Sequence, residues 1–275
     1  MLLVLAISGC GGGGEADEVF TGVAAEDPGP VHVHGLGINP SDGALFIATH
    51  TGLYRVGAGE EEAARVGDSK QDTMGFSIAG PDRFIGSGHP DLRTDLPPHL
   101  GLIESTDAGR TWEPVSLLGE ADFHVLRAAG RQVYGFDATN ARLLASSDGG
   151  RTWTERAAPE PLVDLVAHPG KATTAVASGS VLYRSTDGGR RWSVLGGEPG
   201  YLAWPRADRL YQVVADGRVQ LSRDGGRTWT SRGSIEGEPA AFLGASASEL
   251  YAALHDGTIK VSRDGGRTWS LRSRP

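Results

Sequence analysis

The chain alternates short apolar runs with turn-forming residues along most of its length. The first such stretch contains apolar runs at residues 31–39, 44–50, 52–56 and 63–66, separated by polar residues and glycines. Runs of this length, bounded by turn residues, are typical of β-strands. Similar runs continue to the end of the chain and predict six groups of four strands, at residues 31–66, 73–115, 123–155, 162–195, 201–231 and 240–271.

An eight-residue motif recurs in five of these groups. Its last copy reads SRDGGRTW and begins at Ser262, and the earlier copies begin at Ser105, Ser146, Ser185 and Ser222. The aspartates of successive copies lie 37 to 41 residues apart, which is the period of one four-stranded propeller blade. The pattern therefore predicts an all-β fold, a six-bladed β-propeller of four-stranded antiparallel blades, over residues 31–275.

Each position of the motif has a physical role in a strand-turn-strand unit. The side chain of Asp264 can accept hydrogen bonds from backbone amides just ahead of it, and Gly266 can adopt a positive φ at little cost. Trp269 then begins the next strand and can wedge its ring against the neighbouring blade, a burial of about 150–250 Å² for a large aromatic side chain. We therefore expect the motif to be structural.

The pattern Ser-x-Asp-x-Gly-x-x-Trp resembles the Asp-box, or BNR repeat, of sialidases, sortilin-type receptors and a photosystem II assembly factor. The resemblance implies a propeller in which each box lies on the outer part of its blade. It implies little about function, because one fold serves unrelated activities. The first group lacks the box, and Gly-Ala-Gly-Glu at residues 57–60 replaces it.

Composition and charge narrow the classes of partner. The 275 residues include 41 glycines, which suits one all-β domain with many turns. The net charge is −8, and the arginines are dispersed through the boxes, each beside an aspartate. Because no basic stripe forms, we expect no nucleic-acid partner.

The start of the chain predicts a lipid anchor. Residues 1–7 form an apolar run too short to span a bilayer, and Ser-Gly-Cys follows it. The sequence Ile-Ser-Gly-Cys resembles a bacterial lipobox, although no Lys or Arg precedes the apolar run. The resemblance implies a signal peptide at residues 1–9, a lipidated Cys10, a flexible tether at residues 10–30 and an extracytoplasmic protein attached to the bacterial cell membrane. A buried N-terminal strand is the alternative. Cys10 is the only cysteine, so the chain can form no internal disulfide.

The second group contains an insertion at residues 87–99, between its second and third strands. Long inserted loops tend to be functional or disordered. The three prolines in this one restrict its backbone, which favours a shaped lid rather than a floppy tail.

Seven of the eight histidines fall on one face of the predicted propeller. This is the mouth of the central channel, where the loops entering the first strand and joining the second to the third emerge. The blades that supply these histidines are adjacent, namely blades 6, 1, 2 and 3. The seven are His32, His34, His50, His89, His99, His124 and His255, and His168 falls on the opposite face.

This clustering predicts a metal site. His32 and His34 are two residues apart in a predicted strand, so their side chains leave the same face. Met74 begins the first strand of the next blade and offers a thioether. Imidazole with thioether suits copper best, and imidazoles alone would suit zinc. The predicted ligands are His32, His34, His50, Met74, His89 and His124. His99 and His255 are at the margin, and Asp72, Asp91 and Asp122 could ligate or orient the imidazoles.

Three readings of the mouth remain open. The metal-binding reading competes with hydrogen-bonded wall histidines and a core methionine. Similarity to sialidases implies an exo-sialidase-like glycosyl hydrolase, but the Arg-Ile-Pro signature of those enzymes is missing and the first inner strand reads HVHGLG. A hydrolase of another family would need two carboxylates across the mouth. Five aspartates could supply them: Asp72, Asp91, Asp122, Asp137 and Asp164. The third reading is a scaffold that binds a glycan or a protein.

Overall fold

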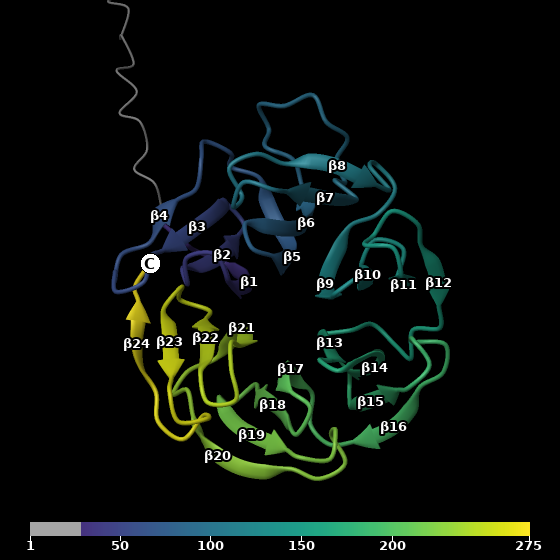
Figure 1. Cartoon of the computed structure of the whole chain (residues 1–275), viewed down its shortest axis with the longest axis vertical. Coiled ribbons are helices and arrows are strands. Elements are labelled where there is room, and N and C mark those ends of the chain that lie inside the picture. Colours follow the sequence, from purple (N-terminus) through teal and green to yellow (C-terminus); the bar gives the residue numbers. More distant parts are fainter. Residues whose placement is uncertain (1–28) are drawn as a thin grey trace, which may run out of the picture.

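The computed structural model describes residues 29–275, and these form six four-stranded antiparallel sheets arranged as a ring (Figure 1). The described residues contain no helix, and therefore no helix long and apolar enough to cross a membrane. The predicted signal peptide, Cys10 and the tether up to residue 28 lie outside the described residues. The prediction of an all-β six-bladed propeller is confirmed for the part of the chain that the structure covers.

Each blade runs in chain order from its innermost to its outermost strand. The strands of the first three blades are these: blade 1, β1 (Val33–Ile38), β2 (Leu45–Thr49), β3 (Gly52–Val56) and β4 (Ala64–Arg65); blade 2, β5 (Asp72–Gly80), β6 (Arg83–His89), β7 (Leu102–Ser105) and β8 (Glu113–Ser116); blade 3, β9 (Phe123–Ala129), β10 (Gln132–Asp137), β11 (Arg142–Ser146) and β12 (Thr154–Arg156).

The other three blades repeat this order. Their strands are these: blade 4, β13 (Asp164–His168), β14 (Lys171–Ser178), β15 (Leu182–Ser185) and β16 (Ser193–Gly196); blade 5, β17 (Gly200–Arg206), β18 (Arg209–Val214), β19 (Arg218–Ser222) and β20 (Thr230–Ser234); blade 6, β21 (Pro239–Gly244), β22 (Leu250–Leu254), β23 (Ile259–Ser262) and β24 (Ser270–Ser273). Blade 6 takes all four of its strands from the C-terminal part of the chain, as the sequence predicted.

The boxes form the turns between the third and fourth strands. In blade 5, the Asp224 carboxylate accepts hydrogen bonds from the amides of Arg227 (3.0 Å) and Thr228 (2.9 Å). The Ser222 hydroxyl donates to the same carboxylate (2.8 Å) and accepts from the Gly226 amide (2.8 Å). Gly226 has φ +92°, a conformation that favours glycine. The predicted turn chemistry is therefore confirmed.

The tryptophans of the boxes pack between blades. Each of the six seams between neighbouring blades holds one apolar cluster, and five of these clusters include the box tryptophan of the later blade. The five are Trp112 at the 1–2 seam, Trp153 at 2–3, Trp192 at 3–4, Trp229 at 4–5 and Trp269 at 5–6. Since blade 1 has no box, the 6–1 seam closes without a box tryptophan.

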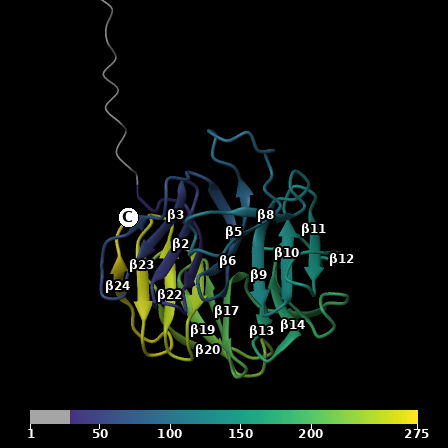
Figure 2. The same cartoon turned by 45° about the horizontal axis from the view of Figure 1, so that its top comes forward.

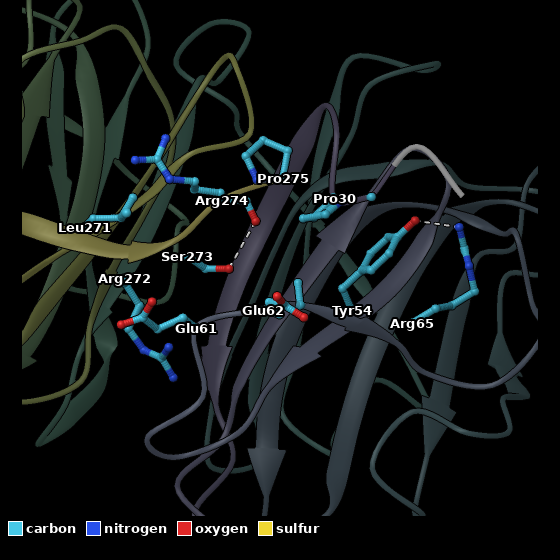
Figure 3. A pocket seen from close by; sticks show the side chains of 12 residues that line it. Pro30, Tyr54, Glu61, Glu62, Arg65, Leu271, Arg272, Ser273, Arg274 and Pro275 are labelled. Atoms are coloured by element: carbon cyan, nitrogen blue, oxygen red, sulfur yellow. Dashed lines mark hydrogen bonds between the residues drawn. The ribbon is translucent and has the colours of Figure 1, made fainter. Parts of the chain in front are cut away.

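The 6–1 seam closes with other residues. Tyr54 and Ile47 of blade 1 pack with Tyr251 of blade 6 in its apolar cluster. The Arg272 guanidinium of blade 6 donates a 2.8 Å hydrogen bond to the Gly57 carbonyl, in the turn that replaces the missing box. A cavity of about 670 Å³ lies beside this seam. Figure 3 shows its lining, with the Tyr54 hydroxyl hydrogen-bonded to Arg65 at one edge.

Candidate functional site

The mouth of the channel holds a first group of metal-ligating side chains, which we name the first triad: His34, His50 and Asp72. His34 lies near the start of β1, His50 lies in the turn between β2 and β3, and Asp72 begins β5 of the next blade. Because inner strands start at the mouth and the β2–β3 turn returns to it, the three side chains converge. One ligand atom from each lies within 4.8 Å of the others.

Two atoms of the first triad face each other without a hydrogen bond. His34 Nε2 lies 3.6 Å from Asp72 Oδ1, and both atoms are buried with no hydrogen-bond partner among the described residues. The other carboxylate oxygen of Asp72 lies 2.9 Å from His50 Nδ1. Burial lowers the pKa of His34 to about 4, and the charges of neighbouring imidazoles, His50 first, act in the same direction. Burial also raises the pKa of Asp72, against the opposing charge of His50.

A second triad lies at the next seam and consists of His89, His99 and Asp122. His89 ends β6, His99 ends the inserted loop, and Asp122 directly precedes β9. His89 Nε2 lies 3.7 Å from Asp122 Oδ2, and the ring centroids of His89 and His99 are 5.7 Å apart. As in the first triad, one ligand atom from each residue lies within 4.8 Å of the others.

His124 supports the second triad from one side. Its Nε2 lies 2.9 Å from Asp122 Oδ2. This hydrogen bond raises the pKa of His124 above its ordinary value, although burial opposes the rise. Burial acts to raise the pKa of Asp122, but the hydrogen bond and charge of His124 outweigh it and hold that pKa below its ordinary value.

The two triads share one design, in which imidazoles of one blade meet an aspartate at the start of the next inner strand. The seam between blades 3 and 4, the third seam, has a variant of this arrangement. There Asp164, which begins β13, is fully buried and accepts a 2.7 Å hydrogen bond from Arg127 of blade 3. Backbone amides of Leu165 and Leu202 also donate to Asp164. In this seam the protein itself supplies the cation.

Met74 and His32 lie close to the triads and belong to neither. Met74 is half-buried in β5 and lines a small cavity of about 110 Å³ together with His34 and His124. His32 has φ +52° and precedes β1, so the expected strand geometry does not hold at this residue. Its ring centroid lies 6.1 Å from that of His50, the same distance as that of His34.

Other candidates have different partners. The Asp91 carboxylate accepts hydrogen bonds from Arg93 and from the Lys70 amide, so it braces the insertion. His255 lies 3.8 Å from Glu238 and takes part in neither triad. His168 ends β13 on the opposite face and packs edge-on against Trp204, with ring centroids 4.9 Å apart.

Sequence reasoning gave too little weight to His99 and to the aspartates of the triads. A usable signal was present, because Asp72, Asp122 and Asp164 all occur at or directly before the first residue of an inner strand. An aspartate that recurs there in three consecutive blades lines one face of the molecule. This periodicity would have placed Asp72 and Asp122 beside the histidines.

Comparisons with known proteins identify the repeat and the fold. The family model for the BNR/Asp-box repeat matches residues 260–271, which contain the last box. A GH74 enzyme from Niastella koreensis is 17% identical with a TM-score of 0.64, over 88% of this chain and 45% of the enzyme. YCF48 from Cyanidioschyzon merolae is 13% identical with a TM-score of 0.55, over 89% of this chain and 86% of that protein. No curated protein gives a significant match.

A GH74 xyloglucanase from Xanthomonas campestris is also similar, with 17% identity and a TM-score of 0.56 over 88% of this chain. This chain spans 45% of the length of that enzyme, as it does for the enzyme from Niastella koreensis. At these identities the similarity shows the fold. The chain is a six-bladed β-propeller that carries the BNR/Asp-box repeat.

Proposed function

We propose that this Asp-box propeller is a membrane-anchored, extracytoplasmic protein that binds a copper-type transition-metal ion at its channel mouth and catalyses no reaction. The first triad carries the proposal. Its single most telling observation is the approach of His34 Nε2 to Asp72 Oδ1, two buried atoms without hydrogen-bond partners among the described residues. An ion between them would satisfy both.

The spacing of these two atoms suits shared ligation. Their separation of 3.6 Å exceeds the roughly 2.7–3.2 Å of an N–H···O hydrogen bond. Two ligand atoms, each about 2.0–2.2 Å from a tetrahedral ion, lie about 3.3–3.6 Å apart. The pair is therefore spaced as two ligands of one ion would be.

The electrostatics favour a cation supplied from outside. With its pKa at about 4, His34 is neutral at pH 7 and presents a lone pair. At the third seam the equivalent carboxylate, Asp164, is neutralised by Arg127. Asp72 has imidazoles in place of such an arginine, so a metal ion would provide the missing charge.

The donor set favours copper, with zinc as the runner-up. Sites of nitrogen and oxygen ligands bind Cu²⁺ more tightly than Zn²⁺ in the general order of divalent affinities. Met74 lines a cavity with His34, and its thioether is a ligand suited to Cu(I). Zinc would use the two imidazoles and the carboxylate alone.

The anchor is proposed on the sequence motif. Cys10 follows the short apolar run and ends a lipobox-like sequence, which supports lipidation and attachment to the outer side of the bacterial cell membrane. A glycan or protein ligand would then meet the propeller outside the cytoplasm.

The alternatives are a glycosyl hydrolase and a protein-binding scaffold. The folds of the GH74 enzymes and of YCF48 are compatible with them. Hydrolysis needs two carboxylates that reach the substrate. The side chains of Asp72 and Asp122 are only 11% and 5% exposed and lie beside imidazoles, which favours metal binding over hydrolysis. Asp164 is paired with Arg127 and is not available to a substrate.

Calorimetric titration of the full chain, prepared without a polyhistidine tag, tests the proposal. We expect Cu²⁺ to bind at the first triad with a dissociation constant below micromolar, and His34→Ala to weaken binding at that triad more than 100-fold. His255→Ala is the matched control, since it removes an exposed histidine of the same mouth and should leave affinity unchanged. Binding weaker than micromolar, or equal losses in the two variants, would count against the site. A panel of glycosides tests the hydrolase alternative in parallel.

A further inference from the structure

We infer that the second triad is a separate metal centre, closed by the inserted loop of blade 2, so that the mouth binds two divalent transition-metal ions. The inference rests on the proposed function for its chemistry, but on different residues. His89, His99 and Asp122 offer two imidazoles and a carboxylate, a set that suits zinc and Cu²⁺. The two triads have no residue in common.

The tautomer of His89 is fixed by the loop itself. Its Nδ1 lies 2.8 Å from the carbonyl oxygen of Pro98. Because a carbonyl oxygen only accepts, Nδ1 carries the ring proton and donates it to this bond. The lone pair is then on Nε2, which faces Asp122 Oδ2 at 3.7 Å. A backbone carbonyl that holds the far nitrogen of an imidazole is the usual outer-shell partner of a metal-binding histidine.

Unsatisfied atoms mark the position of the ion. His99 Nδ1 and Asp122 Oδ1 are buried and have no hydrogen-bond partner among the described residues. The 3.7 Å between His89 Nε2 and Asp122 Oδ2 is too long for a hydrogen bond and close to the roughly 3.3–3.6 Å between two ligands of a tetrahedral ion. An ion bound by all three residues, through His99 Nδ1 and Asp122 Oδ1 among its ligand atoms, would give both of these buried atoms a partner.

Asp122 is held in place for this role. His124 Nε2 lies 2.9 Å from its Oδ2, and the Asp122 carboxylate is 5% exposed. His124 is thus a positioning residue, which orients the carboxylate from outside the triad. An outer-shell partner of this kind typically contributes 10–100-fold to metal affinity.

The centre would tie down both ends of the inserted loop. His89 and His99 bracket it, and its neck is closed by a 2.9 Å hydrogen bond from the Leu100 amide to the Gly88 carbonyl. The loop projects from the ring between β6 and β7 (Figures 1 and 2). Leu92 at its tip is fully exposed. An ion held by His89, His99 and Asp122 would fasten the base of the loop to blade 3.

Metal counting separates this inference from the proposed function. The full chain is dialysed against Zn²⁺, and bound zinc is measured by mass spectrometry, with the melting temperature of each variant recorded. We expect two equivalents in the wild type and in His255→Ala, and one each in His34→Ala and His99→Ala. One equivalent in the wild type, removed by His34→Ala, would overturn the second centre alone. No bound zinc would overturn the second centre and would restrict the first triad to copper. Two equivalents retained by His99→Ala would also overturn the second centre.

Limited trypsin digestion provides an independent readout. Arg93 lies in the loop with its side chain 62% exposed, so trypsin can cleave after it when the loop opens. Zn²⁺ should slow this cleavage at least tenfold in the wild type and in His34→Ala, and should not slow it in His99→Ala. Equal protection of the wild type and His99→Ala would contradict the second centre.

Discussion

At the residue scale, one aspartate carboxylate holds the turn of each box in place. Asp224 accepts hydrogen bonds from the Thr228 hydroxyl (2.7 Å) and from two backbone amides, which only an ionised carboxylate can accept in full. The Thr228 hydroxyl, and then its amide, lower the pKa of Asp224 to about 2. The other four boxes repeat the arrangement, although Arg191 replaces the threonine in blade 4.

Acid should therefore weaken the boxes. The folded-state pKa of Asp224 lies below its ordinary value of 3.8, so its contribution to stability is present above about pH 4 and is lost as the pH falls towards 2. The variant Asp224→Asn has no carboxyl group to protonate, so it lacks this pH-dependent contribution. We expect the wild type to melt at the higher temperature at pH 6 and the difference to shrink by pH 2.5, as measured by circular dichroism. A difference that is constant with pH would contradict the account.

The limits of sequence reasoning are also visible at this scale. His32 was predicted to share a strand face with His34, but its positive φ ends the extended geometry before β1. No pattern in the sequence predicts that backbone conformation. His89 and His99 are ten residues apart and meet because the loop neck closes, a tertiary event that spacing alone does not reveal. The predicted single cluster is therefore two triads in the structure.

At the scale of elements, blades were predictable because each is a local unit. Its four strands follow one another in the chain, so the pattern of apolar runs and the box spacing specify a blade without long-range information. The predicted insertion starts too early, because residues 87–89 pair with β5 as the end of β6, and the loop between β6 and β7 begins at Pro90. The box also contributes to packing between blades, because Trp229 packs with Leu195 against the apolar cluster of blades 4 and 5.

Removing one of these tryptophans should loosen one seam. Trp229→Ala should destabilise the protein by about 3 kcal/mol, the low end for truncation of a large aromatic side chain, because the ring is only partly buried. Urea unfolding measures the change, and Val194→Ala, at a side chain that is 69% exposed, serves as control. Metal binding at the mouth should survive. An unchanged unfolding midpoint together with lost binding would show that the box serves the site rather than the fold.

The whole molecule is a ring whose seams have different roles. The outer parts of five seams carry box tryptophans, whereas the mouth of the 1–2 seam carries the first triad and that of the 2–3 seam the second. The 6–1 seam closes through Tyr54 and the Arg272 hydrogen bond to the boxless turn. The sequence predicted that blades 6, 1, 2 and 3 supply the histidines of the mouth, but blade 6 contributes to neither triad. Which residues form each triad depends on how neighbouring blades meet in the closed ring.

The anchor also belongs to this scale. Cys10→Ser should leave a folded propeller that is no longer lipidated, because Cys10 is the only cysteine and the predicted point of attachment. After expression in a bacterial host, the variant should move from the membrane fraction to the soluble fraction. Retention on membranes through a high-salt wash would contradict the lipoprotein prediction.

Anomalous diffraction at the copper edge, from crystals grown with Cu²⁺, tests the central claim most directly. We predict a peak at the channel mouth about 2.0–2.2 Å from both His34 Nε2 and Asp72 Oδ1, the normal length of such bonds. Crystals of His34→Ala should lack it. A map in which copper is found only at histidines outside the two triads, such as His168, with no density between His34 and Asp72, would contradict metal binding at the first triad.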